Sequence, residues 1–141
     1  MAITQAIPNS FKQEVLVGTH NLTVAGDAMK IALYTSASTM SAATTIYAIT
    51  AEISGTGYTA AGKALTNVTP VLSGSTAICD FADVSWTSAT FTAAGALIYN
   101  STDANKAVAV LDFGGDQTVS SGTFTIQFPT ADASNAIIRI A

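Results

Sequence analysis

The apolar side chains of this chain follow two different periods along the sequence. In the first eighteen residues they recur four apart, at Phe11 and Val15, which predicts a short helix with one apolar face. Ser10 stands where an N-cap would be, and Gly18 is a suitable terminator. We therefore expect residues 1–18 to form an N-terminal arm followed by a helix of about two turns.

Beyond Gly18 the period changes to two, which is the period of a β-strand. Met29, Ile31 and Leu33 share one face of the first such segment. Glycine pairs and polar clusters separate it from a series of similar segments. The predicted strands are residues 29–34, 66–72, 76–81, 84–86, a segment around 91, 96–99, 106–113, 124–128 and 135–141.

Short strands without intervening helices of crossover length predict an all-β fold. We expect an antiparallel β-sandwich, immunoglobulin-like or jelly-roll-like, with one short N-terminal helix, in a single domain of residues 1–141. Residues 106–113 are apolar on both faces, which is typical of a central strand or of one covered by a partner. The predicted core residues are Ile31, Leu33, Trp86, Leu97, Val108, Val110, Phe124, Ile126, Phe128 and Ile138.

The chain carries unusually few charges. Charged residues make up 10% of the sequence, against about 25% in typical soluble domains. Such a surface suits a protein that stays in contact with other protein, because charge is depleted at the centres of lasting interfaces. The alternative is a monomer kept soluble by its hydroxyl groups and its net charge of −4.

The distribution of charge and hydropathy argues against two other classes of partner. Nucleic acid requires a concentrated basic patch, whereas no two basic residues are adjacent here. No apolar run approaches the roughly 18 residues needed to span a bilayer, and the N-terminal segment lacks the features of a secretory signal. The basic residues are Lys12, Lys30, Lys63, Lys106 and Arg139.

Several motifs resemble catalytic or binding sites but lack essential parts. Residues 57–64 match most of a phosphate-binding loop, yet Ala64 stands where Ser or Thr would hold Mg²⁺. Asp112 and Asp116 flank two glycines, but Ca²⁺ requires six to eight oxygen ligands. His20, the single histidine, has no evident nucleophile, and local hydrogen bonding is its expected role. We predict no catalytic residues, metal site or cofactor, and no enzymatic activity.

The remaining reactive and aromatic residues have structural interpretations. Cys79 is the single cysteine and lies in an apolar stretch, so we expect a buried thiol that packs as a small hydrophobe. Trp86 and the tyrosines could line a sugar-binding platform. Tryptophan in a strand of a small sandwich more often belongs to the core, with tyrosines at the rim and their hydroxyls in water.

Several segments, in the same order along most of the chain, resemble a family of small structural proteins of tailed bacteriophages. The clearest are residues 55–59, 81–86, 95–100, 107–115 and 135–140, supported by 10–14 and 30–34. Proteins of this kind are head decoration or cement proteins, capsid fibres or tail components. The resemblance implies a virion protein without catalytic residues.

Resemblance and composition together predict a capsid decoration or cement protein that stabilises the head shell and is assembled in the host cytoplasm. The expected partners are copies of itself, with a trimer as a natural match to capsid symmetry axes, and the major capsid protein. The alternative is a tail or adhesion component that contacts tail proteins or the host surface. The residues predicted to make intersubunit contacts are Ile3, Ile7, Phe11 and Val15.

Overall fold

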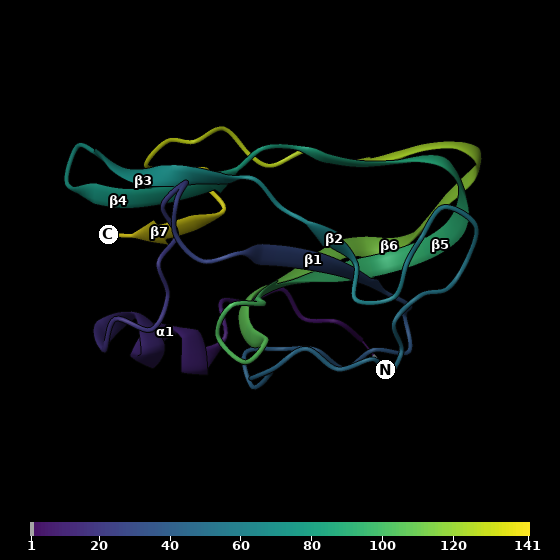
Figure 1. The fold of residues 1–141 in the computed structure, drawn as a ribbon, viewed down its shortest axis with the longest axis horizontal. Coiled ribbons are helices and arrows are strands. Elements are labelled where there is room, and N and C mark those ends of the chain that lie inside the picture. The colour runs from purple at the N-terminus through teal and green to yellow at the C-terminus, as the bar shows by residue number, and fades with distance from the viewer. Residues whose placement is uncertain (1) are drawn as a thin grey trace.

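The computed structural model describes residues 2–141 and contains two antiparallel sheets and one short helix (Figure 1). This architecture confirms the predicted sandwich-like, mostly β fold with an N-terminal helix. Met1, the first residue of the predicted arm, lies outside the described residues. The elements are α1 (Asn9–Leu16), β1 (Met29–Tyr34), β2 (Lys63–Ala64), β3 (Asn67–Ser73), β4 (Thr76–Phe81), β5 (Val84–Asn100), β6 (Lys106–Ile126) and β7 (Ile138–Ile140).

The larger sheet has the strand order β2-β1-β5-β6. It is buried on both faces at its centre, over β1, residues 93–100 of β5 and residues 107–111 of β6, whereas β2 and most of the remainder of β6 are exposed. Alternate residues of β1 enter two different hydrophobic cores, with Ile31 and Leu33 in one and Ala32 and Tyr34 in the other. The first core also contains Trp86 of β5. Because both faces are covered, β1 is apolar at almost every position instead of alternating with polar residues.

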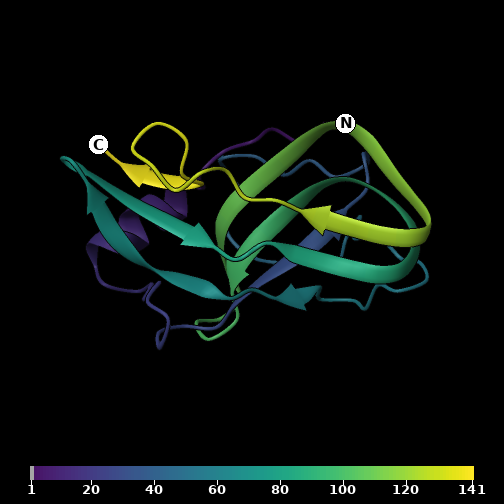
Figure 2. The ribbon, with the colours of Figure 1, turned by 90° about the horizontal axis from the view of Figure 1, so that it is seen from above.

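Strands β5 and β6 form one long hairpin, where the sequence predicted several shorter strands. Figures 1 and 2 show this hairpin curving back over the sheet at one end of the molecule. Gly114 and Gly115 were expected to end a strand, but β6 continues to Ile126. Both glycines have positive φ, of 79° and 144°, in a wide bulge opposite Ala94.

A second bulge changes which side chains of β6 share a face. Tyr99 pairs with Ala107 and Ile98 with Ala109, so Val108 has no partner of its own on β5. Strict alternation would place Val108 and Val110 together. Instead Val108 joins Ala109 in the first core, and Val110 lies in the second.

The free edge of β6 is covered by the chain itself at residues 106–110. Ala6 and Val110 exchange two backbone hydrogen bonds, and the N–H of Ala107 donates to the carbonyl of Thr45. The N-terminal arm and the loop of residues 35–62 therefore take the place that a neighbouring subunit would occupy. Both faces of residues 107–111 are apolar because one face lies in the first core and the other in the second.

The smaller sheet has the order β3-β4-β7 and lies above α1 in Figure 1. Phe81 and Ile138 of this sheet pack into the first core. Phe124 and Phe128 were predicted core residues and are half-buried against the same core. The other predicted core residues are buried, namely Ile31, Leu33, Trp86, Leu97, Val108, Val110, Ile126 and Ile138.

Helix α1 begins differently from the sequence prediction. It starts at Asn9, with Pro8 at the N-cap position and no side-chain capping bond, so Ser10 lies inside the first turn. Pro8 has the extended backbone of an N-cap residue, with φ −55° and ψ 142°, and its carbonyl accepts the first helical hydrogen bond from Lys12. Gly18, with φ 78°, follows the last turn as predicted.

Candidate interaction surface

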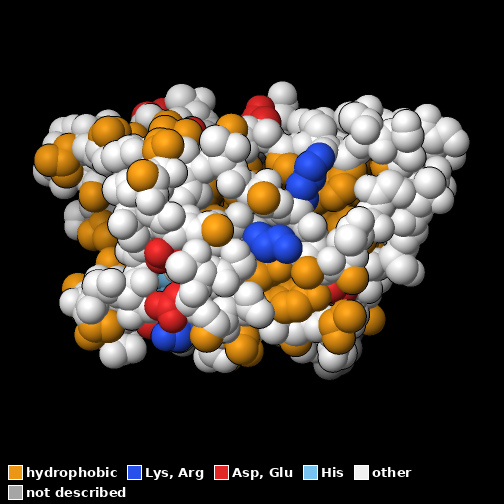
Figure 3. Space-filling view, in the orientation of Figure 1, with side chains coloured by type: hydrophobic (Ala, Val, Ile, Leu, Met, Phe, Trp, Pro, Cys, Tyr) orange, Lys and Arg blue, Asp and Glu red, His pale blue; other side chains and the backbone are white. Residues whose placement is uncertain are grey.

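The exposed aliphatic side chains are concentrated at one end of the molecule. Within residues 2–141, only Ile46 and Ile49 among the strongly exposed large hydrophobic residues lie in the loop beside the large sheet. The rest lie on α1, on the segment after it, and on β3 and β7. Figure 3 shows hydrophobic side chains at this end, on the left, and others over the lower centre and right of the same face. We call this group the apolar end: Leu16, Val17, Val24, Val68, Val71, Leu72 and Ile140.

Part of the apolar end extends the core face of the small sheet. Leu72 pairs with Ala77, which pairs with Ile140, so these three side chains share one face. Two residues along, Cys79 pairs with Ile138 on the same face, and both are buried in the first core. The face that packs on the helix at one end is therefore uncovered at the other, where Leu72 is 73% and Ile140 56% exposed.

Helix α1 does not fill the space beneath this sheet. A hollow of about 500 Å³ lies between the helix and the sheet, bordered by Phe11, Val15, Cys79 and Ile138. A second hollow, of about 310 Å³, lies between α1 and β7 and adds Leu16 to the lining. Both have predominantly apolar walls, so the end of the sandwich is open and hydrophobic.

The four residues predicted to contact a neighbouring subunit occupy different environments. Ile3 is 7% and Phe11 3% exposed, and both pack into the chain's own cores. We correct their assignment to internal packing, because the arm that carries Ile3 folds back onto β6 and the helix that carries Phe11 turns this side chain into the first core. Ile7 and Val15 are half-buried and line the hollow between α1 and β7.

Sequence reasoning missed Leu16, Val17 and Leu72, the most exposed of the larger side chains near the helix and the β3–β4 turn. A signal was present, because adjacent residues point in different directions, so at the end of an element with one covered face a pair of bulky aliphatic residues leaves one of them exposed. Leu16 and Val17 form such a pair at the end of α1, and Val71 and Leu72 form another before the turn at Gly74.

A buried polar network fastens α1 to the end of β5. The His20 side chain is fully buried, with Nε2 3.0 Å from Glu14 Oε1 and Nδ1 3.0 Å from Asn100 Nδ2. Asn100 Oδ1 accepts two backbone N–H groups, so its amide nitrogen donates to His20 and to Asp27. Nδ1 therefore accepts and Nε2 donates to Glu14, which corresponds to a neutral imidazole. The network joins elements of the fold and contains no nucleophile.

All four tyrosines of the chain lie around Glu52. The hydroxyls of Tyr47 and Tyr58 donate to the two carboxylate oxygens, each at 2.6 Å, and the N–H of Ala61 donates to one of them. The hydroxyls of Tyr34 and Tyr99 donate to backbone carbonyls, and Tyr47 stacks on Tyr99 with ring centroids 4.8 Å apart. These hydroxyls bind protein groups instead of water, contrary to expectation, and hold the loop of residues 35–62 against the large sheet.

The surroundings of these tyrosines disfavour the charged phenolate. Burial raises the pKa of Tyr34, Tyr47, Tyr58 and Tyr99 above the usual value, and the nearby Glu52 carboxylate raises each of them further. All four hydroxyls therefore remain neutral donors at physiological pH. The cluster is suited to holding a loop in place and does not supply a reactive base.

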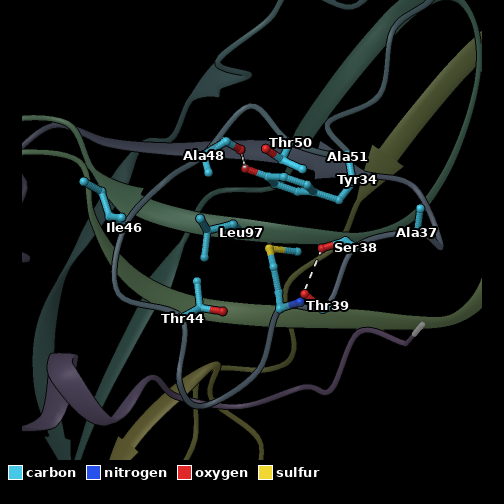
Figure 4. Close-up of a pocket in the computed structure, with 11 residues that line it drawn as sticks. Tyr34, Ala37, Ser38, Thr39, Thr44, Ile46, Ala48, Thr50, Ala51 and Leu97 are labelled. Carbon is cyan, nitrogen blue, oxygen red and sulfur yellow. Dashed lines mark hydrogen bonds between the residues drawn. The ribbon is translucent and has the colours of Figure 1, made fainter.

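A small hollow of about 210 Å³ lies between the loop of residues 35–62 and the large sheet (Figure 4). Tyr34 and Leu97 form part of its wall, with Ser38 and Met40 opposite. The Tyr34 hydroxyl is already bonded to the Ala48 carbonyl at 2.6 Å. No charged side chain lines this hollow, so it has neither an acid–base pair nor a counter-ion for a charged ligand.

The glycines of residues 57–64 serve close packing. A Cβ at Gly62 would lie 1.9 Å from the carbonyl oxygen of Ile31, and one at Gly57 would lie 3.0 Å from Ala89 Cα. Both glycines also have positive φ. Glycine is therefore required at these two positions because the loop passes close to the backbone of β1 and β5 there.

Asp112 makes a local contact at the bulge that contains Gly114. Asp112 Oδ1 accepts the N–H of Gly114 at 2.9 Å, as expected for a residue that stabilises a bulge. Among residues 2–141, no group of three or more His, Cys, Asp or Glu side chains is arranged to hold a metal ion.

Comparison with known protein families, with curated proteins and with solved structures finds no match for this chain. Across residues 2–141, no helix has the length and apolar character needed to cross a membrane. The apolar end and the packing around it are therefore the features from which a function can be argued.

Proposed function

We propose that this chain is a non-enzymatic structural protein of a tailed-bacteriophage particle, a capsid decoration or cement protein that binds its neighbours through the apolar end. The observation that carries the proposal is the concentration of seven exposed aliphatic residues on one end of an otherwise well-covered fold. The low charge content and the resemblance of the segments listed above support the same class of protein.

The size of the apolar end is appropriate for a protein interface. Full burial of an aliphatic side chain gains about 1.5–3 kcal/mol, equivalent to roughly 60–120 Å² at about 25 cal/mol per Å². The seven residues are 42–86% exposed and so leave on the order of 400 Å² of apolar surface, with Leu72 and Ile140 on one face of the small sheet and Val68 and Val71 on the other. A stable interface buries about 800 Å² per partner, of which somewhat more than half is apolar.

A shell-binding protein would use this surface to bridge capsid subunits, so that expansion of the shell must break additional contacts. Copies arranged as a cyclic homo-oligomer, with a trimer as the proposed state, would engage several sites at once and gain avidity. Ile7 and Val15 border the same end and belong to the proposed contact region.

The alternative role as a tail or adhesion component has less support. Glycan contact would be expected to use aromatic rings exposed at loop tips. In this chain Trp86 is buried, and the tyrosine hydroxyls are bonded to protein groups.

Antibody–gold labelling of purified phage particles, counted separately over heads and tails, tests the proposed function. Label distributed over heads is the expected result. Label confined to tails would transfer the function to tail assembly or host contact, and unlabelled particles would contradict a virion role.

A further inference from the structure

The small sheet has one edge that is open to another strand. β7 pairs with β4 on one side, and none of the backbone hydrogen bonds within residues 2–141 lies on its other side. The opposite edge of the sheet is β3, which contains Pro70 and an irregularity between Val68 and Val71. Proline and a bulge both hinder strand pairing, so β7 is the edge suited to accept a strand.

The open edge lies beside the hollow of about 310 Å³ described above, which we call the β7 groove. Ile138 and Ile140 are two residues apart, so their side chains point to the same face, and both line the groove opposite Val15 and Leu16. Arg139 points to the other face. A strand added to β7 would place alternate side chains against this apolar wall and the intervening ones on the side of Arg139.

The charge beside the groove is positive. Lys12 and Arg139, two of the five basic residues of the chain, line it, and no acidic residue does. Neither forms a salt bridge within the described residues. The Asp132 carboxylate lies near Arg139 and offsets part of its charge, and Arg139 Nη1 donates to the carbonyl of Ala133 at 3.1 Å.

We propose that β7 binds an extended segment of a different protein, in which aliphatic and acidic residues alternate. The backbone of the segment would pair with the free edge of β7, its aliphatic side chains would enter the β7 groove, and its carboxylates would lie on the other face, near Arg139. This inference rests on the proposed function of the apolar end as the contact surface, and specifies the chemistry of the partner.

A second copy of this chain is a poorer occupant of the same edge. Two β7 strands paired around a two-fold axis centred on this three-residue strand would place Arg139 opposite Arg139 of the other copy. Like charges directly opposite each other destabilise a strand pair. An acidic segment removes this repulsion and replaces it with attraction.

Titration of the isotope-labelled full chain with two synthetic hexapeptides, one alternating Val and Glu and one alternating Val and Lys, tests the proposal by NMR. We expect the Val–Glu peptide to shift the amide signals of Ile138–Ile140 and of α1. The Val–Lys peptide should bind about three- to tenfold more weakly, because the charges at the rim repel it. Arg139→Glu should weaken binding of the Val–Glu peptide by a similar factor, whereas the matched charge reversal Lys63→Glu, outside the groove, should leave it unchanged.

Equal binding of the two peptides, or shifts confined to other elements, would overturn the proposal. Shifts of the β7 signals with protein concentration alone would show that a second copy occupies the edge, and would also overturn it. The labelling of particles is independent of these outcomes, so a failure of the peptide test and a failure of the proposed function can be told apart.

Discussion

The two sheets of this protein are covered to very different extents. The centre of the large sheet is buried on both faces, and the edge of β6 at residues 106–110 is closed by the N-terminal arm and the loop of residues 35–62. The small sheet packs one part of one face on α1 and leaves the continuation of that face exposed, beside an open edge at β7. The centre of one sheet is therefore covered within the chain, and the other sheet retains the features of a surface that another protein completes.

This contrast shows how a chain with few charges can be stable and still present a surface that binds other proteins. The large sheet supplies the core that holds the fold together, and the small sheet can then leave hydrophobic side chains uncovered without loss of structure. Two leucines illustrate the difference, because Leu97 is 1% and Leu72 73% exposed. The same side chain contributes to folding at one position and is free for binding at the other.

The largest expected effect is that of Leu97→Ala on stability, and Leu72→Ala is its matched control. Leu97→Ala removes a fully buried side chain and should lower the free energy of unfolding by about 2–5 kcal/mol. Leu72→Ala should change it by less than about 0.5 kcal/mol. Urea unfolding followed by circular dichroism measures both values, and equal losses at the two positions would break the proposed contrast between the sheets.

Removing the carboxylate that holds the long loop should have the next largest effect. Glu52→Ala leaves the hydroxyls of Tyr47 and Tyr58 and the N–H of Ala61 without their acceptor. Each unsatisfied group that stays buried costs about 1–3 kcal/mol, and we expect a total loss of about 2–4 kcal/mol because water reaches part of the cluster. Asp116→Ala, at an exposed residue of β6 with no side-chain hydrogen bond in the structure, is the matched control.

The tyrosine cluster should also make the fold sensitive to alkaline pH. The pKa of all four tyrosines is raised in the folded state above the ordinary value of 10.0, so the folded state favours the neutral phenol. Their contribution to stability is complete below pH 10 and is lost as pH rises above it, because the unfolded chain then releases protons that the folded chain retains. The urea concentration at the midpoint of unfolding should therefore decrease once the pH is raised above about 10. A tyrosinate absorbance that rises around pH 10 in the folded protein would contradict this account.

The smallest expected effect concerns the thiol of Cys79. Burial, with a smaller contribution from the charge of Asp80, raises the pKa of Cys79 to about 12. The native protein should therefore react very slowly with a thiol reagent at neutral pH and rapidly in denaturant. A cysteine introduced as Leu72→Cys should react at the rate of a free thiol, and comparable rates at both positions in the native protein would contradict the difference in burial.

The sequence predicted the elements whose patterns are local. The apolar face at Phe11 and Val15, the strand that became β1, and the segment that became β4 were recognised because period and flanking turn residues agree there. The long β5–β6 hairpin was divided into short strands, since small hydroxyl residues and Gly114–Gly115 give turn signals that tertiary pairing overrides.

Properties that depend on contacts between distant segments could not be read from the sequence. The arm was expected to bind a neighbour because Ile3 is apolar, but its contact with the chain's own β-strands depends on the position of β6. In the same way, the gathering of all four tyrosines around Glu52 joins residues from 34 to 99, and no local pattern indicates it.

Cysteine footprinting in assembled particles tests most directly whether the small-sheet end is the contact surface. Leu72→Cys and Thr118→Cys would each be incorporated into phage particles, with Thr118 as an exposed position on the far part of β6 and Cys79 silent because it is buried. We predict that the cysteine at position 72 reacts about tenfold or more slowly in particles than in the free protein, since a docked partner excludes the reagent, while the one at position 118 reacts equally in both. If position 72 reacts as fast in particles as in the free protein, the apolar end is not the surface by which this protein assembles.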